Sequence, residues 1–379
     1  MRILASFYPV GISDDVFLQL SSATSGGPVC PQLQHLTWTS TLGWKPMRLF
    51  LSPRLVSVNF VDDGVKRGDM ALITTISLLP TTYLEDLDLR IYYPPSTPIH
   101  SVLSEVVQRL GPRFKRLTTE SSLSDAAWEH LASLPKLVSF EVFDTPRTEI
   151  LKPLPHENAF PALKSMEIRV DNVHQYWSFL FPLLESSPLQ KVTVVTYCIQ
   201  DGNIPSQVTA AMLGAQLQRT IDTLIFEGFD PTNLTFLSHL GSFGSLKTLD
   251  CITACRWPGQ CVSPLTDPDI EGLARGSPHL VTLSLGHECG DRHYHTTTKS
   301  MVSLSTHCLS LEDLFLPCDL TNISEDIKTE SGESDPRLEI WSACKLSSLD
   351  FGVVVMPPLE DIEASEIAIS ALSHLFPQL

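Results

Sequence analysis

The chain has 379 residues, of which 43% are hydrophobic, and its 43 acidic and 26 basic side chains give a formal net charge of −17. This apolar content is sufficient for a large core and excludes an intrinsically disordered chain. The acidic balance makes nucleic acid and anionic membrane surfaces unfavourable partners, because both are bound by basic surfaces. The longest apolar stretch, residues 177–184, is far shorter than the roughly 20 residues of a membrane-spanning helix.

The cysteines and the start of the chain indicate a reducing compartment. The nine cysteines are an odd number, are scattered, and lack the regular spacing of a disulfide framework. Residues 1–15 contain one basic residue and a short apolar run that Pro9 and Gly11 interrupt, which makes a poor secretion signal. We therefore expect free thiols and a cytoplasmic or nuclear location.

One nine-residue phrase recurs twelve times along the chain. An apolar residue, mostly Leu, is followed after two residues by a second apolar residue and after one more by a third, as in SPRLVSVNF at 52–60. The leading apolar residues are Leu33, Leu55, Leu84, Phe114, Leu137, Leu163, Leu189, Ile221, Leu246, Leu280, Leu311 and Leu346, and a thirteenth phrase is cut off at Leu379. The mean step of about 29 residues lies at the upper end of the leucine-rich repeat range, where each unit is a strand plus a helix.

The segments between the phrases predict helices. In chain order, the clearest are residues 101–110, 126–134, 177–186 and 208–218. Ser124 and Asp125 precede the second of these segments and provide an N-cap. A Pro or Gly before many of the leading apolar residues ends the helix and allows the next strand to begin.

Alternating strands and helices specify the fold class. We predict an α/β leucine-rich repeat solenoid, or horseshoe, of about 12 irregular repeats, with parallel strands on the concave face and helices on the convex face. One repeat cannot bury its own apolar side, so neighbouring repeats must stack. An ordinary doubly wound α/β fold is the alternative. The second apolar position of the phrases is expected to be buried, at Leu36, Leu87, Leu224, Leu249, Leu283, Leu314 and Leu349.

No linker divides the chain, so residues 1–379 are predicted to form a single solenoid domain. Residues 322–339 are polar and acidic and are expected to be a flexible insertion, or simply a solvated loop. Terminal repeats of a solenoid need a polar outer face, and the sequence ends inside a strand phrase at Leu379 without one. We therefore expect the chain to be a fragment at one or both ends.

The long, irregular units and their Pro-Leu-x-x-Leu-x-Leu phrases resemble the leucine-rich repeat regions of fungal F-box proteins over essentially the whole chain. The resemblance implies substrate recognition in an SCF-type ubiquitin ligase, where an F-box binds a Skp1-type adaptor and the repeats hold the protein to be ubiquitinated. No F-box precedes Cys30 in this chain, so the adaptor is an expected partner only if an F-box exists upstream. The alternative is a stand-alone intracellular scaffold without a link to ubiquitin.

The sequence carries no recognised catalytic motif. It contains no Gly-rich dinucleotide loop, no Walker loop, no Gly-x-Ser-x-Gly and no His-Glu-x-x-His. The chain is therefore predicted not to be an enzyme and to need no cofactor.

Cysteine and histidine residues gather after the ninth and tenth phrases. Cys255 and Cys289 both lie nine residues after their leading Leu. Cys261 and His295 both lie fifteen residues after it. Equal offsets on neighbouring units bring side chains together, and Cys and His are zinc ligands. The spacing matches no standard zinc site, however, so buried thiols and ordinary loop histidines are the preferred interpretation.

The residue four positions after each leading apolar residue faces outward along the concave side. It is acidic in five units, at Asp88, Glu141, Glu167, Asp250 and Asp350, and in none is it Lys or Arg. This acidic lean favours a basic partner by charge complementarity. A face that is merely soluble is the alternative explanation.

We predict that a protein partner binds the concave face and the strand-exit loops of residues 226–317. The steps between phrases are among the longest here, and extended loops on one face of a solenoid are often where binding is built. Aromatic side chains are favoured interface anchors. The residues selected as partner-binding are Asp250, Trp257, His287, His293, Tyr294 and Phe315. The alternative is that these loops are padding in a variable repeat.

Overall fold

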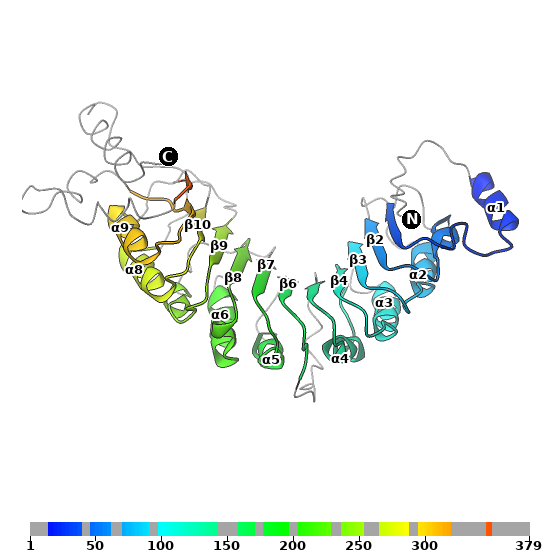
Figure 1. Ribbon diagram of the computed structural model, residues 1–379, viewed down its shortest axis with the longest axis horizontal. Coiled ribbons are helices and arrows are strands. Elements are labelled where there is room, and N and C mark those ends of the chain that lie inside the picture. The colour runs from blue at the N-terminus through cyan, green and yellow to red at the C-terminus, as the bar shows by residue number, and fades with distance from the viewer. Residues whose placement is uncertain are drawn as a thin grey trace, which may run out of the picture. The chain divides into compact units, whose positions relative to one another are not determined.

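The structure is a computed structural model. It describes residues 14–39, 46–61, 70–90, 98–142, 158–170, 177–196, 204–228, 236–253, 265–287, 295–319 and 346–350. The chain divides into two compact units, of which unit 1 comprises residues 1–170 and 183–188 and unit 2 comprises residues 171–182 and 189–379. Both units are built from parallel strands and helices (Figure 1).

The strands follow one another in the sheet in chain order, from β1 to β12. Those of unit 1 are β1 (His35–Thr39), β2 (Ser57–Val61), β3 (Asp86–Arg90), β4 (Arg116–Thr119), β5 (Ser139–Val142) and β6 (Ser165–Val170). Those of unit 2 are β7 (Lys191–Thr196), β8 (Thr223–Glu227), β9 (Thr248–Thr253), β10 (Thr282–His287), β11 (Asp313–Phe315) and β12 (Ser348–Asp350). Each of the twelve phrases contains one strand, as predicted. The sequential order argues against a doubly wound fold, in which the strand order reverses.

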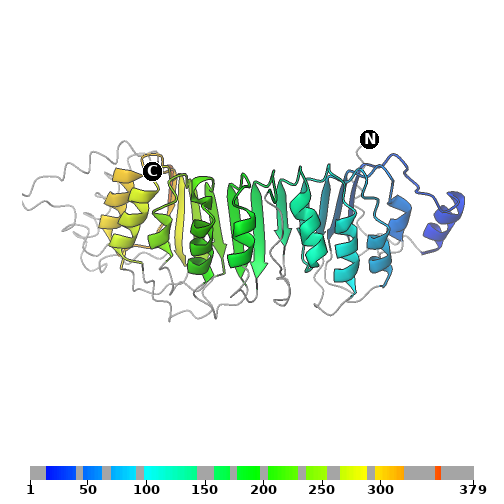
Figure 2. The same cartoon turned by 90° about the horizontal axis from the view of Figure 1, so that it is seen from below.

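Helices lie on one side of the strands in each unit (Figures 1 and 2). In unit 1 they are η2 (Pro46–Phe50), α2 (Met70–Ser77), α3 (Ile99–Gln108) and α4 (Asp125–Ser133), whereas α1 (Asp14–Ala23) lies beyond the end of the sheet, next to η2. The others are α5 (Trp177–Leu183), α6 (Ile204–Gly214), η3 (Leu217–Arg219), α7 (Leu237–Leu240), α8 (Asp267–Gly276) and α9 (Thr298–His307). All four predicted helices are present. The one predicted over 208–218 begins earlier and ends at Gly214, because Gln216 adopts a left-handed φ of 57° before η3.

Side-chain caps fix where several helices begin. Ser124 is the N-cap of α4, as predicted, and its Oγ accepts a hydrogen bond from the amide of Ala127 at 3.4 Å. Thr266 and Asp269 form a capping box at the start of α8. The neighbouring Asp267 carboxylate accepts from the amide of Thr297, the N-cap of α9, at 2.7 Å, so it ties the starts of two successive helices together.

The apolar positions of the phrases form the core. All twelve described leading residues, from Leu33 to Leu346, are at most 4% exposed. At the second apolar position, Leu36, Leu87, Leu224, Leu249, Leu283 and Leu314 are buried as predicted. The expectation was wrong for Leu349, which is only partly buried. Among the described strands, β12 pairs only with β11, so less of the sheet packs around this side chain.

A repeated hydrogen-bond pattern sets the register between strands. The carbonyl oxygen of Gln34 accepts from the amides of both Val56 and Ser57, at 2.7 and 3.0 Å. In unit 2 the carbonyl oxygen of Lys247 accepts in the same way from Val281 and Thr282, at 2.7 and 3.0 Å. In every case the shared carbonyl belongs to the residue after a leading apolar residue. The two amides belong to the two residues that follow the next leading residue, so within each unit every phrase is aligned on the one before it.

Small residues before the leading apolar residue add side-chain bonds between neighbouring repeats. Ser52 is fully buried and its Oγ donates to the carbonyl oxygen of Pro31 at 2.7 Å. The thiol of Cys308, also fully buried, lies 3.6 Å from the carbonyl oxygen of Ser277. A buried polar group needs such a partner. The position is not restricted to small residues, because Leu134, Phe160 and Phe243 occupy it in other repeats and are also buried.

Several sequence-based expectations concern parts of the chain outside the described residues. These are the insertion at 322–339 and both ends of the chain, residues 1–13 and 351–379. The curvature of a horseshoe and a single domain over residues 1–379 stay predictions. No helix within the described ranges is long and apolar enough to cross a membrane.

Candidate functional site

Four of the residues selected from the sequence lie on described elements of unit 2. Asp250 on β9 and Phe315 on β11 are partly buried and occupy the same row, because Asp250 pairs with Ser284 and Ser284 with Phe315. Two strand spacings therefore separate them, which is about 10 Å. His287 is the last residue of β10, and His295 is exposed in an isolated bridge with Thr266. The sheet thus brings only Asp250 and Phe315 onto one row of its surface.

The remaining selected residues lie outside the described part of the chain. They are Cys255, Trp257, Cys261, Cys289, His293 and Tyr294. Because three of the four candidate zinc ligands are among them, the zinc alternative stays untested. Within the described residues, no group of three or more His, Cys, Asp or Glu side chains is placed to hold a metal ion.

Unit 1 has a more extensive arrangement on its open strand face, which we define as the face of the strands opposite the helices. Its central row contains one residue from each strand, in register from β1 to β6: Thr37, Asn59, Asp88, Thr118, Glu141 and Glu167. All six side chains are partly buried, whereas the residues on either side of them along the strands point into the core. Asp88, Glu141 and Glu167, three of the acidic positions singled out from the sequence, therefore share one row.

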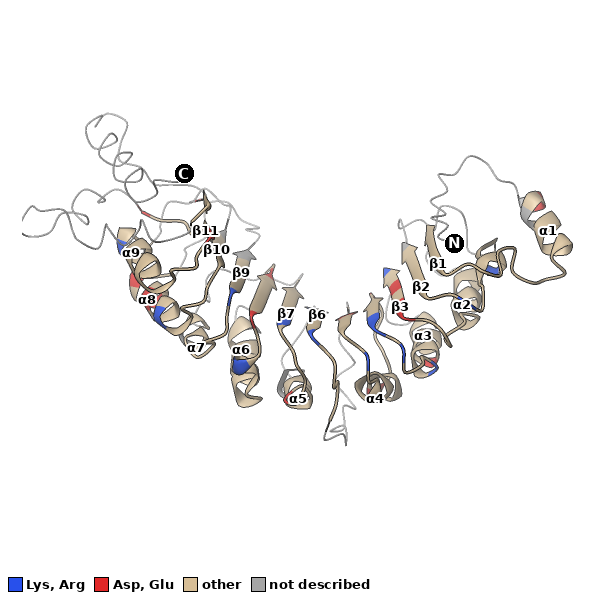
Figure 3. Ribbon diagram, viewed as in Figure 1, with Lys and Arg blue, Asp and Glu red and all other residues tan. Residues whose placement is uncertain are grey.

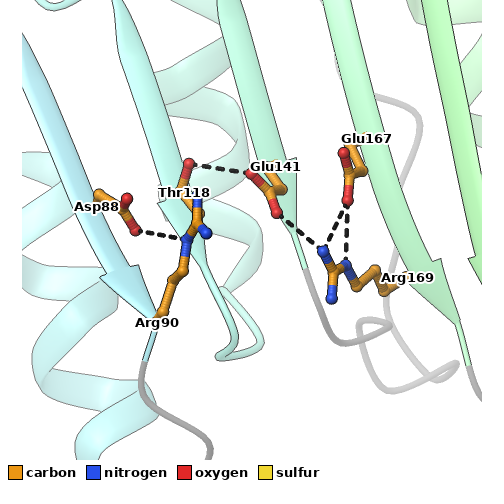
Figure 4. A network of polar contacts seen from close by, with 6 residues as sticks. All are labelled: Asp88, Arg90, Thr118, Glu141, Glu167 and Arg169. Atoms are coloured by element: carbon orange, nitrogen blue, oxygen red, sulfur yellow. Dashed lines mark hydrogen bonds and ion pairs between the residues drawn. The ribbon is translucent and has the colours of Figure 1, made fainter. Parts of the chain in front are cut away.

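Two arginines, Arg90 and Arg169, pair with the carboxylates of this row. Arg90 Nε lies 3.3 Å from Asp88 Oδ1. The Arg169 guanidinium lies 3.0 Å from Glu167 Oε1 and 3.4 Å from Glu141 Oε1, so it bridges two neighbouring strands. Figure 4 shows the resulting network, in which Thr118 Oγ1 also donates to Glu141 Oε2 at 3.3 Å.

The balance of burial and charge in the network raises two carboxyl pKa values. Burial raises the pKa of Asp88, and the nearby Arg90 only partly offsets this effect. Burial also raises the pKa of Glu141, the charge of Glu167 raises it further, and Arg90 and Arg169 act in the opposite direction. Ionised carboxylates here are therefore incompletely compensated by the arginines of the chain itself.

A second polar row lies two residues earlier on the same strands. Its central members are Asp86 and Arg116, which are paired in register and form a two-pronged ion pair. Arg116 Nε lies 2.7 Å from Asp86 Oδ1, and a second guanidinium nitrogen lies 2.8 Å from Oδ2. Strand β3 itself carries both acidic and basic residues (Figure 3). Exposed pairs of this kind add little stability, so the row contributes chiefly a charge pattern.

The central row of unit 2 has a different composition. It contains Thr193, Ile225, Asp250, Ser284, Phe315 and Asp350 in register. Thr193 and Ser284 are buried, and no basic residue interrupts the row. The acidic positions Asp250 and Asp350 were predicted from the sequence to face outward, and they lie on β9 and β12, three strand steps apart rather than adjacent. This row has apolar and hydroxyl side chains where unit 1 has a network of charges.

Arg90 and Arg169 were not selected from the sequence, although a local signal was present. Each lies two residues after an acidic member of the row, in Asp88-Leu-Arg90 and Glu167-Ile-Arg169. Residues two apart on a strand point to the same face, so an acidic and a basic residue at this spacing can pair. Only the registers of neighbouring strands reveal that Arg169 also reaches Glu141.

The sequence was also compared with known proteins. No protein-family model matches it, and no curated protein matches it either.

Proposed function

We propose that this chain is a leucine-rich repeat protein that binds another protein and catalyses no reaction. Twelve phrases with one strand each, parallel pairing in chain order and helices between the strands support the repeat assignment. The phrase Leu-x-x-Leu-x-Leu, with its apolar positions in the core, is the signature of this repeat class. Repeat proteins of this kind bind their partners on extended surfaces built from successive units.

The observation that carries the proposal is the open strand face. In each unit the helices cover one side of the strands. Along the other side the central row has partly buried polar side chains in unit 1 and a mixture of polar and apolar side chains in unit 2. Such rows present adjacent side chains at a regular spacing of about 4.8 Å. A partner protein would find a preorganised surface there, and little rearrangement would be needed on binding.

For the cellular context, we propose substrate recognition in an SCF-type ubiquitin ligase. The resemblance of the phrases to fungal F-box proteins supports this context. A stand-alone scaffold is the second candidate, and the two differ in whether a Skp1-type adaptor binds the product of the full-length transcript. Co-precipitation of the purified full-length product with purified adaptor tests this directly. Stoichiometric adaptor binding supports the ligase context, and its absence favours the scaffold.

The binding function itself is tested with a partner found by proximity labelling and then purified. A direct complex with the full chain is expected at micromolar concentrations or below. The predicted site around Asp250 and Phe315 is tested by Phe315→Ala combined with Asp250→Asn, which should weaken binding by more than about 1 kcal/mol. The control is Glu312→Gln, which alters an exposed residue outside the central row. If no candidate forms a direct complex with the purified chain, the proposed function is wrong.

A further inference from the structure

We propose that the open strand face of unit 1 binds an arginine side chain of a partner protein, at the carboxylate of Asp88 and the amide oxygen of Asn59. This inference rests on the proposed function and specifies the chemistry of the partner. Three observations support it: acceptor oxygens without adequate donors, an excess of negative charge, and a guanidinium that already bridges two strands of the same row.

The first observation concerns acceptors at the β2–β3 side of the network. Asn59 and Asp88 are paired in register, which places them on adjacent strands about 4.8 Å apart. Asn59 Oδ1 is buried and has no hydrogen-bond partner in the described structure. Asp88 Oδ1 is also buried, and its contact with Arg90 at 3.3 Å is longer than a charge-assisted hydrogen bond of about 2.7–2.9 Å. Buried acceptors without good donors are unfavourable, so an incoming N–H donor would stabilise both.

Both side chains can present these oxygens to a partner. The Asn59 and Asp88 residues as a whole are only partly buried, although the two oxygen atoms are covered. Both lie on the open strand face, so rotation about their side-chain bonds is sufficient to turn the oxygens outward. The backbone of β2 and β3, which the parallel ladder holds in place, does not need to move.

The second observation is the charge of the network. It contains three carboxylates, on Asp88, Glu141 and Glu167, and two guanidinium groups, on Arg90 and Arg169. One negative charge is therefore uncompensated within a partly buried cluster. Burial raises the pKa values of Asp88 and Glu141, and the charge of Glu167 raises that of Glu141 further. An additional cation would complete the compensation, whereas an additional anion would increase the repulsion.

The third observation identifies arginine as the preferred cation. Arg169 already bridges Glu141 and Glu167 from adjacent strands with one guanidinium group. The planar guanidinium has several N–H donors in a fixed fork, so it can reach two neighbouring acceptors at once, whereas the lysine ammonium is a compact point charge. Asn59 and Asp88 have the same spacing as Glu141 and Glu167, since both pairs are in register on adjacent parallel strands. A partner arginine between β2 and β3 would repeat the contact that Arg169 makes between β5 and β6.

The experiment measures binding of fluorescein-labelled Gly/Ser peptides to the full chain by fluorescence anisotropy. One peptide carries arginines, a second carries lysines at the same positions, and a third carries citrulline, which has nearly the shape of arginine without its charge. The arginine peptide is expected to bind at least several-fold more tightly than the lysine peptide. The citrulline peptide should lose at least about tenfold in affinity. Equal affinity for the arginine and citrulline peptides would overturn the proposal.

Variants locate the binding site and control for the overall charge of −17, which attracts any basic peptide. Asp88→Asn should weaken binding of the arginine peptide by about tenfold. Glu141→Gln removes a charge two strands away and should weaken it by less. Asp313→Asn and Asp350→Asn remove the same charge from exposed positions in unit 2 and should change it less than about twofold. An equal loss in all four variants would mean non-specific attraction and would overturn the proposal.

Asn59→Ala removes the amide oxygen without changing the net charge. It should weaken binding of the arginine peptide several-fold while leaving the thermal unfolding temperature of the protein within the range of the control variants. Unchanged affinity in this variant would remove Asn59 from the site and contradict the proposed geometry. If these peptide tests fail while a purified partner still binds the chain, the arginine site is wrong and the proposed binding function stands.

Discussion

Units 1 and 2 have the same backbone plan but different open strand faces. In both units, leading apolar residues are buried and each strand is aligned on its predecessor by a shared carbonyl oxygen. The central row of unit 1 nevertheless has three carboxylates that pair with two arginines, whereas that of unit 2 has Ile225 next to Asp250, and then Ser284 and Phe315 between Asp250 and Asp350. The core positions therefore define the repeat, and the outward positions are free to differ. A partner that recognises charge would bind unit 1, and one that recognises apolar surface would bind unit 2.

The largest expected effect tests whether the two cores are equivalent. Leu87→Ala in unit 1 and Leu283→Ala in unit 2 each truncate a buried side chain at the second apolar position. Each should lower the free energy of unfolding by roughly 2–5 kcal/mol, because a cavity remains in the core. Urea denaturation followed by circular dichroism measures both. A difference of more than about 2 kcal/mol between the two variants would show that the cores are not equivalent.

The next largest expected difference between the two units is in thiol reactivity. Burial raises the pKa of Cys251 and of Cys318 in unit 2 to about 12. Cys30 in unit 1 is partly exposed. Because the thiolate is the reactive form, Cys251 and Cys318 should react with a thiol reagent at least on the order of a hundredfold more slowly than Cys30. Peptide mapping by mass spectrometry identifies the modified residues. Comparable rates for all three would indicate that unit 2 opens readily under native conditions.

Two glycines of α8 in unit 2 should respond to alanine in opposite directions. A Cβ at Gly276 would overlap the backbone of Gly241, so Gly276→Ala should destabilise the protein by about 1–3 kcal/mol. A Cβ at Gly272 would meet nothing within 4 Å on an exposed helix face, so Gly272→Ala should stabilise it by roughly 0.5–1 kcal/mol. Thermal unfolding of both variants measures the effects. The same sign for both would mean that α7 and α8 are not packed as closely as described.

The smallest expected effect concerns the pH dependence of unit 1. The pKa of Glu141 is higher in the folded state than its ordinary value, mainly because of burial. The folded state therefore holds this proton more tightly, and the free energy of unfolding decreases as pH rises from the ordinary pKa through the raised one. Glu141→Gln should flatten this decrease and leave stability at neutral pH unchanged or slightly higher.

Urea denaturation at a series of pH values between about 4 and 7 tests this prediction. Glu312→Gln, at an exposed residue of unit 2, is the matched control and should leave the pH profile close to that of the wild type. A steeper decrease in Glu141→Gln than in the wild type would show that the arginines outweigh burial, and would contradict the direction of the shift.

The fold was largely predictable because it depends on a periodic signal. Leu55, Leu84 and Leu246 recur with the same following pattern, and a parallel strand forms at each of them. Helix boundaries were less predictable where local backbone geometry decides them, as at Gln216, whose left-handed conformation has no signal in the apolar pattern. The partial exposure of Leu349 depends on which strands flank β12, so its own phrase could not reveal it.

The candidate site was predictable only in part. The acidic row follows from counting residues after each leading apolar position, and the strand registers place Asp88, Glu141 and Glu167 as expected. The contact between Arg169 and Glu141 joins residues 28 positions apart, and its geometry depends on side-chain conformations that a sequence pattern does not specify. The same applies to Asn59, because its amide oxygen is notable only for lacking a donor.

The shared carbonyl oxygens also determine where insertions and deletions in the chain can be tolerated. The step from Leu33 to Leu55 is 22 residues and that from Leu311 to Leu346 is 35. The phrases of Leu55 and Leu346 nevertheless contact their predecessors through the same pair of amide-to-carbonyl hydrogen bonds. An insertion after a strand lengthens a loop and leaves both bonds intact. A single residue inserted between the leading apolar residue and its strand would shift every following side chain of that strand to the opposite face. Insertions and deletions should therefore accumulate between strand end and helix in natural variants, while the few codons after each leading apolar residue keep a constant length.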